Sequence, residues 1–166
     1  MARGFEAAYA LLVAMMSVVA HAAAAPPTCP PLPDDMRAAR IHAAGGPEAL
    51  RVERIALPRP GRDDVLVRVR NASINPVDWK LQEAGRLPMP ATPGGDFAGE
   101  VVAVGAGVEG VACGMAVVGI ANPRGHGGSY AEYVSVPAGQ VAAKPPAYSF
   151  AEAAAYPTVA VAAWRY

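Results

Sequence analysis

The side chains with the most evident chemistry lie in two short segments, Ser73–Lys80 and Gly95–Val102. Asn75 offers an amide that donates and accepts hydrogen bonds, whereas Asp78 and Asp96 offer carboxylates that accept them or coordinate a cation. Asp78 has two readings, as a functional carboxylate or as a first-turn carboxylate that favours the dipole of a helix. For Asp96 we expect a supporting role, in which the carboxylate accepts backbone N–H bonds of its loop.

A metal centre is not expected from these residues. A catalytic zinc needs three nitrogen, sulfur or carboxylate ligands on rigid elements and one open position. Asp96 is the one residue near the motif that could serve, and the three histidines, His21, His42 and His126, are scattered along the chain. The sequence therefore predicts no zinc.

A glycine motif, Gly105-Ala106-Gly107-Val108-Glu109-Gly110, has the G-x-G-x-x-G spacing of dinucleotide-binding loops. In such loops the motif opens a helix whose N-terminus holds the pyrophosphate. Here the motif leads into another apolar stretch, 111–120. Glu132 has the sequence spacing of the acidic residue that binds the ribose in such folds, but it lies inside a predicted strand rather than at its end. We expect a turn between strands rather than a nucleotide site.

Short alternating stretches separated by Gly and Pro turns predict a mainly β fold. The expected strands are 37–42 and 50–56, which form a hairpin, then 65–70 with one buried face, 97–104, 115–120, 130–136 and 141–144. A helix is expected over 76–83, a second after the capping box Ser149–Glu152, and a third from about Thr158, because Pro157 interrupts the second. This order favours a compact, partly open β-barrel.

Together the segments Ser73–Lys80 and Gly95–Val102 resemble the catalytic domain of the medium-chain dehydrogenase/reductase superfamily, in its zinc-independent quinone oxidoreductase branch, similar to zeta-crystallin. The resemblance covers about Met36 to Tyr166. It implies a GroES-like barrel without the nucleotide-binding Rossmann domain, and hydride transfer from NADPH to a small quinone or enone. Binding of NADPH would then require the missing second domain.

The resemblance also assigns candidate site residues. The loop Asn75-Pro76-Val77-Asp78 would border the cleft for nicotinamide and substrate, which makes Asn75 and Asp78 the candidate catalytic residues. Asn75 would also bind the cofactor, by hydrogen bonds to its ribose or carboxamide side. Thr158 is the second candidate cofactor-binding residue, since Ala162 stands where family members commonly have a threonine.

Other positions depart from the family pattern. Zinc-dependent members carry a Cys near the place of Asn75 and Gly-His-Glu where this chain has Gly94-Gly95-Asp96. Lys80 stands where many members have an aromatic hydroxyl, and Met115 replaces a turn Asp. Trp79 is expected in the core.

Composition limits the partners. The 166 residues carry 14 Lys and Arg against 14 Asp and Glu, so the formal net charge is zero. No basic run is interleaved with aromatic residues, which argues against nucleic-acid binding. The two cysteines, Cys29 and Cys113, could form one disulfide, but the position of Cys29 in a Pro-rich tether favours two free thiols.

The first 35 residues differ from the rest. Residues 1–25 resemble a secretory signal peptide, with an apolar run and small residues before a cleavage site, and are too short for a stable membrane span. Residues 26–35 form a Pro-rich linker. Alternatively the start is miscalled and translation begins at Met36. The first reading implies an exported or periplasmic protein, the second a cytoplasmic one.

Two functions follow from these observations. In the first, residues 36–166 are the GroES-like catalytic domain of an NADPH-dependent oxidoreductase, truncated before the Rossmann domain. This domain alone would be inactive, and would pair with a nucleotide-binding domain in trans or form a homo-oligomer. In the second, the chain is a non-catalytic GroES-like interaction module or a gene fragment.

Overall fold

The computed structural model describes residues 28–125 and 127–165, so the predicted leader over residues 1–25 lies outside the described residues. The strands are β1 (Asp35–Arg40), β2 (Arg51–Ala56), β3 (Asp64–Ala72), β4 (Asp96–Val104), β5 (Ala116–Ile120), β6 (Tyr133–Pro137) and β7 (Val141–Ala143). The helices are α2 (Pro76–Glu83), α3 (Phe150–Ala154) and α4 (Pro157–Trp164), with short 3-10 turns η1 (Pro47–Ala49) and η2 (Ala138–Gln140).

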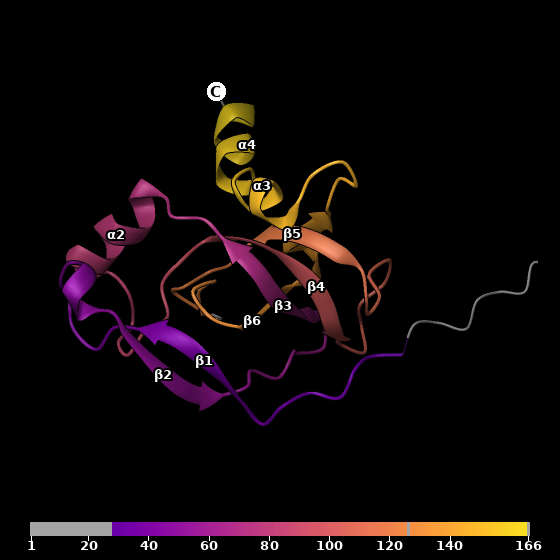
Figure 1. The fold of residues 1–166 in the computed structure, drawn as a ribbon, viewed down its shortest axis with the longest axis horizontal. Helices are drawn as coiled ribbons and strands as arrows, with labels where there is room; N and C mark the ends of the chain where they lie inside the picture. The colour runs from indigo at the N-terminus through magenta and orange to yellow at the C-terminus, as the bar shows by residue number, and fades with distance from the viewer. Residues whose placement is uncertain (1–27, 126, 166) are drawn as a thin grey trace, which may run out of the picture.

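Two open antiparallel sheets form the fold, as Figure 1 shows. One has five strands in the order β6-β3-β4-β5-β7, and the other is the hairpin β1-β2. Neither sheet closes on itself. The mainly β, partly open architecture predicted from the short alternating stretches is therefore confirmed.

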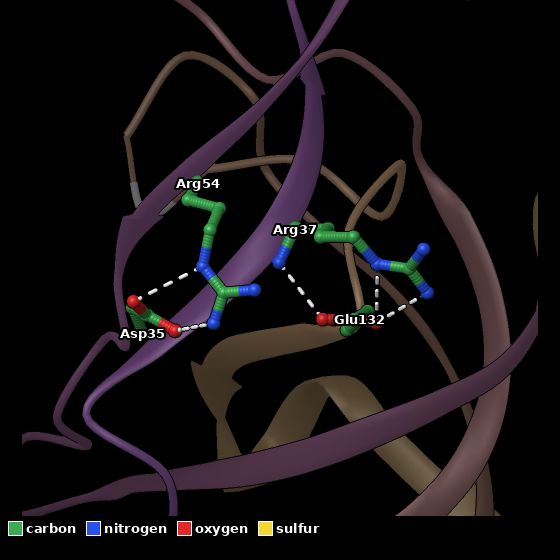
Figure 2. Close-up of polar contacts among 4 residues, drawn as sticks. All are labelled: Asp35, Arg37, Arg54 and Glu132. Atoms are coloured by element: carbon green, nitrogen blue, oxygen red, sulfur yellow. Dashed lines mark hydrogen bonds and ion pairs between the residues drawn. The ribbon is translucent and has the colours of Figure 1, made fainter.

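The β1-β2 hairpin is attached to the segment that precedes β6. The backbone N–H of Ala39 donates to the carbonyl of Tyr130 at 2.8 Å. Arg37 contacts Glu132 through its backbone N–H at 2.8 Å, its side-chain Nε at 2.9 Å and an ion pair from Nη2 at 2.8 Å (Figure 2). Within the hairpin, Arg54 forms an ion pair with Asp35. The backbone bonds fix the register, because exposed ion pairs contribute little.

The main core lies on one face of the five-stranded sheet. Its buried side chains come from four strands and a loop, namely Val65, Val67, Phe97, Val101, Val117, Ala121, Val134 and Val136. Leu66 is buried as well, so the prediction that β3 buries one face only is wrong at its start. The opposite face of β3 and β4 is covered by α3, where Ala153 and Ala154 pack on Ala98.

The glycine motif at 105–110 is a turn, as predicted. Gly105 N–H donates to the carbonyl of Asp64 and Gly107 N–H to that of Arg62, both at 2.8 Å. The chain then enters β5 without an intervening helix. Glu132 is engaged by Arg37, which also lowers the pKa of that carboxyl, chiefly through the backbone hydrogen bond. The motif therefore serves the connection between β4 and β5.

The predicted strand at 130–136 begins three residues later, at Tyr133. Tyr130 N–H donates instead to the carbonyl of Pro93, and Glu132 N–H donates to that of Arg37. These hydrogen bonds do not belong to the regular pairing of two strands. They join the segment before the edge strand β6 to β1 and to the loop before β4. The residue types at 130 and 132 do not reveal that their backbone N–H groups bond to Pro93 and Arg37 instead of to a neighbouring strand.

The helices follow their sequence signals closely. α2 spans Pro76–Glu83 as expected. In the capping box before α3, Glu152 N–H donates to Ser149 Oγ at 3.2 Å, and Ser149 N–H donates to the Glu152 carboxylate at 2.8 Å. α4 begins at Pro157, consistent with a proline in the first turn. In the described ranges no helix is long and apolar enough to cross a membrane.

The two cysteines form a disulfide between Cys29 and Cys113, with their Cα atoms 5.2 Å apart. The prediction of two free thiols is wrong. The bond joins residues 84 apart in the sequence, and it fixes the Pro-rich segment beside the loop that leads into β5. Residue patterns describe local structure and give no sign that Cys29 lies next to Cys113, 84 residues later in the chain.

Two tryptophans lie at the surface. Trp79 is 44% exposed on α2, with Lys80 Nζ at 5.5 Å from its ring centre, so its predicted place in the core is wrong. Trp164 is 91% exposed on α4, which projects from the sheet in Figure 1. Val159 and Val161 are exposed on the same helix. α4 therefore presents apolar side chains to solvent.

Candidate functional site

The carboxylate of Asp96, at the start of β4, is fully buried and gathers the polar groups of the site. It accepts from Asn75 Nδ2 at 3.0 Å and from Ser73 Oγ at 3.3 Å. From α4 it accepts the Thr158 N–H, 3.1 Å from each oxygen, and the Thr158 hydroxyl at 2.6 Å. Asp96 thus accepts a backbone N–H as predicted, but the donor is 62 residues away rather than in its own loop.

The side-chain amide of Asn75 is oriented by this carboxylate. Asn75 is the N-cap residue of α2, and its Nδ2 faces Asp96 and, at 3.4 Å, Ser73 Oγ. A carboxylate only accepts hydrogen bonds, so the NH2 group and not the oxygen must point toward it. The side-chain carbonyl oxygen of Asn75 faces the backbone N–H of Asp78 in the capping box of α2, and it is the one atom of this side chain that can accept a further hydrogen bond.

Asp78 is the third residue of α2 and is 4% exposed. Its Oδ2 accepts the backbone N–H of Asn75 at 2.7 Å and the hydroxyl of Tyr130 at 3.3 Å. Burial raises the pKa of the Asp78 carboxyl, and the bond from Asn75 opposes that shift. Asp78 is thus a first-turn carboxylate that accepts the backbone N–H of Asn75.

Tyr130 was not among the residues predicted for the site. It lies before β6 and reaches Asp78 over a separation of 52 residues. Burial, followed by the charge of Asp78, raises the pKa of the Tyr130 hydroxyl well above its ordinary value, so the hydroxyl stays protonated and donates. No spacing signal could have paired these residues, since a loop and a helix bring them together.

Asn75 and Thr158 line the same groove, which lies between α2 and α4 and has a volume of about 490 Å³. Apolar side chains form the rest of its wall, namely Pro76, Val77, Val159, Ala162 and Ala163. Asp78 does not line it. The structure therefore brings together the two predicted cofactor-binding residues, and places the third candidate behind them as a support.

A second groove, of about 790 Å³, lies on another side of α4 against β5 and β7. Its wall is mostly apolar and includes Val118, Val141 and Val161, with Arg165 at the end of α4. α4 therefore stands between two concave surfaces. A bound molecule that extends past this helix would contact both.

No group of three or more His, Cys, Asp or Glu side chains within 28–125 and 127–165 is placed to hold a metal ion. His42 Nε2 lies 2.6 Å from the carboxylate of Glu53 at the surface of the hairpin. The other two histidines, His21 and His126, lie outside the described residues. Both oxygens of Asp96 are already engaged by hydrogen-bond donors.

Comparison with known proteins gives the same assignment as the motifs. The family model of the alcohol dehydrogenase GroES-like domain matches residues 61–146. A chloroplastic quinone-oxidoreductase homolog of Spinacia oleracea is 38% identical over 124 residues, which are 72% of this chain and 37% of that protein. A chloroplastic NADPH-dependent alkenal/one oxidoreductase of Arabidopsis thaliana is 35% identical over 136 residues, 76% of this chain and 35% of that protein.

Among solved structures, the quinone oxidoreductase from Coxiella burnetii superposes with a TM-score of 0.74 and 33% identity, over 79% of this chain and 44% of that one. This chain thus spans less than half the length of each relative. The matched part is their GroES-like domain, with the same strand-rich architecture. The chain belongs to the alcohol dehydrogenase GroES-like domain family of the medium-chain dehydrogenase/reductase superfamily.

Proposed function

We propose that this chain is the catalytic-domain portion of an NADPH-dependent, zinc-independent oxidoreductase that reduces quinones, enones or related carbonyl compounds. The observation that carries the proposal is the groove in which Asn75 and Thr158 lie together on the buried carboxylate of Asp96. The names of the matched relatives, a quinone oxidoreductase and an NADPH-dependent alkenal/one oxidoreductase, supply the substrate and cofactor classes.

In this function the chain's own residues bind and orient. The side-chain oxygen of Asn75 accepts from a hydroxyl or amide of the nicotinamide nucleotide, while Asp96 orients the side chain and Asp78 holds the backbone N–H. The apolar wall from Val77 to Ala163 is exposed in this chain, and it would keep water from the reacting groups once the second domain covers it. When bound, NADPH supplies the hydride. Because both N–H groups of Asn75 are engaged, Asn75 does not stabilise negative charge on the substrate oxygen.

The proposal includes a second component. In the superfamily the cofactor's pyrophosphate is held by a nucleotide-binding domain, and positioning of the donor can account for about 7–11 kcal/mol of barrier in favourable cases. We expect residues 36–166 alone to turn over slowly, and activity to need that domain in trans or a second copy of the chain. The exposed apolar side chains of α4 support such an association.

The experiment is a titration of the purified protein with NADPH, followed by a quinone-reduction assay with and without a separate nucleotide-binding polypeptide. Turnover that appears only with the second polypeptide supports the proposal. Micromolar NADPH binding and turnover by the monomer would refute the requirement for a partner. Asn75→Ala is the matched variant, and it should lower the affinity for NADPH in the reconstituted complex.

Zinc independence is tested separately by metal analysis. Within residues 28–125 and 127–165 no three possible metal ligands lie together, so we expect purified protein to carry far less than one equivalent of zinc. Treatment with a chelator should leave both folding and activity of the reconstituted complex unchanged. One equivalent of zinc that survives dialysis would contradict this expectation.

The second candidate is a non-catalytic interaction module. It is favoured by the exposed Val159, Val161 and Trp164 on α4, which suit a protein partner whether or not a cofactor binds. The two candidates differ in one result: a module would bind its partner without any NADPH-dependent turnover in the complex. The reconstitution assay above therefore also decides between them.

We also propose that residues 1–25 are a leader, that 26–35 are a linker, and that the protein is exported. The disulfide between Cys29 and Cys113 supports this, because disulfides persist in oxidising compartments and are rare in the cytoplasm. N-terminal sequencing of the protein from its native cells tests the proposal. A mature chain that begins at Met1 would refute it, and one that begins at Met36 would show a miscalled start and a cytoplasmic protein.

A further inference from the structure

The groove depends on a side chain that does not line it. We propose that Asp96 is a positioning residue, which couples the seating of α4 to the hydrogen-bonding polarity of Asn75 through one buried carboxylate. The inference rests on the proposed function only in treating the groove as the ligand site. Its two parts, the seating of α4 and the orientation of Asn75, are measurable without any turnover.

The first part concerns the start of α4. The first N–H groups of a helix lack intrahelical partners and require a cap. Tyr156, at the N-cap position, makes no side-chain capping bond, and Pro157 has no N–H to offer. Thr158 donates both its N–H and its hydroxyl to Asp96. A carboxylate from β4 therefore does the work of the cap, and it sits where the helix dipole favours negative charge.

The second part concerns Asn75. Its Nδ2 donates to the same Asp96 oxygen that accepts one of the bonds from Thr158 N–H. Because Asp96 and Ser73 hold the NH2 group, the polar atom that Asn75 can offer to the groove is its oxygen, which also faces the Asp78 N–H in the capping box, so Asn75 accepts hydrogen bonds there rather than donating them. It selects ligand groups that carry an O–H or N–H, and it disfavours groups that can only accept.

The two parts are coupled because they share one acceptor, Asp96. The donors to Asp96 in the described ranges are Ser73, Asn75 and Thr158, and the carboxylate is fully buried. Thr158 and Asn75 donate to the same carboxylate, so each depends on Asp96 rather than on the other donor. Replacing Asp96 should therefore release α4 and Asn75 together.

The first test uses nuclear magnetic resonance on the ¹⁵N-labelled full chain. In Asp96→Asn, we expect amide hydrogen exchange at Thr158 to quicken by roughly tenfold, as the loss of a charge-assisted hydrogen bond predicts. The side-chain NH2 signals of Asn75 should move in the same variant. Asp64→Asn removes a carboxylate that accepts Gly61 N–H at a surface turn, and should change neither signal. A change at Thr158 with no change at Asn75 would overturn the coupling.

Variants that remove only one donor to Asp96 provide the test if Asp96→Asn does not fold. Thr158→Val should weaken protection at the start of α4 and leave the Asn75 signals near their original positions, because Asp96 is still present. Asn75→Ala should leave the exchange rate at Thr158 almost unchanged. Loss of protection at Thr158 in Asn75→Ala would show that Asn75, rather than Asp96, seats the helix.

The polarity of the groove is tested with two neutral probes, nicotinamide and N,N-dimethylnicotinamide, which differ in their amide N–H groups. At millimolar concentration nicotinamide should shift the signals of Asn75 and Thr158, whereas the dimethyl compound should not. Equal shifts by both probes, or none by either, would overturn the assigned polarity. Those results would leave the reconstitution assay intact, so failure of this inference is distinguishable from failure of the proposed function.

Discussion

The hydroxyl of Tyr130 donates to Oδ2 of Asp78 at 3.3 Å, and the same oxygen accepts the backbone N–H of Asn75 at 2.7 Å. A loop before β6 is thereby joined to the first turn of α2. The position of Asn75 in the groove depends on this contact as well as on Asp96. Tyr130 thus belongs to the site, although it lies outside the motif that marks it.

Tyr130→Phe should lower the free energy of unfolding by about 1 kcal/mol near neutral pH, as expected for one hydrogen bond. The bond favours ionised Asp78 and so lowers the pKa of that carboxyl. Its contribution is therefore present at neutral pH and lost as the pH falls and Asp78 becomes protonated. Urea unfolding of both proteins across a pH series measures the difference. Tyr133→Phe is the control, and a loss that is equal at every pH would contradict the assignment.

Asp78→Asn should change the pH dependence of stability. Burial raises the pKa of Asp78 in the folded protein above its ordinary value of 3.8. The folded state then binds this proton more tightly than the unfolded state does, so the residue makes stability fall as pH rises from 3.8 through the raised pKa. The Asn variant lacks this fall. Parallel curves of unfolding free energy against pH for the two proteins would show that Asp78 does not titrate in this way.

Gly105→Ala and Gly110→Ala should differ in cost, although both belong to the G-x-G-x-x-G motif. A Cβ at Gly105 would lie 2.1 Å from the carbonyl oxygen of Gly61, whereas one at Gly110 would meet nothing within 4 Å. We expect about 3 kcal/mol or more for Gly105→Ala from overpacking. Gly110 has a φ of +75°, so its replacement should cost about 1–2 kcal/mol. Thermal unfolding compares them, and equal costs would argue against a packed turn.

Reduction of the disulfide should lower the free energy of unfolding by about 2–5 kcal/mol, because Cys29 and Cys113 are 84 residues apart. Urea unfolding with and without dithiothreitol measures this. The double variant Cys29→Ser, Cys113→Ser should have the stability of the reduced protein and should not respond to the reductant. A reductant effect of the same size in the double variant would mean that it does not act on this bond.

Sequence patterns predicted the local elements well, because the signals for α2 and α3 lie within a few residues of each helix start. The Ser149–Glu152 capping box and the proline at the start of α2 are such signals. Asn75 and Thr158 were placed in one site by resemblance alone, and the shared groove explains why they meet.

The errors concern contacts over long separations. The hydroxyl of Tyr130, the bond between Cys29 and Cys113, and the α4 donors of Asp96 all join segments that only the fold brings together. The exposure of Trp79 has a related cause. Helix α2 has no clear apolar face, and its buried residues are Asp78 and Gln82. Asp78 binds Asn75 and Gln82 binds the carbonyls of Gly45 and Gly46, so polar contacts orient this helix.

The disulfide also decides how the domain would carry mechanical load. A pull on the chain at Cys29 passes through the covalent bond to Cys113, beside β5, before it can reach β1. The β1-β2 hairpin is attached to the rest by backbone bonds, exposed ion pairs and the buried side chains of Met36, Ala38 and Ile41, and it is thereby shielded from that force. Tension applied from the N-terminal side would be borne by the five-stranded sheet, and the hairpin would unravel under load only after the sulfur bridge had been broken.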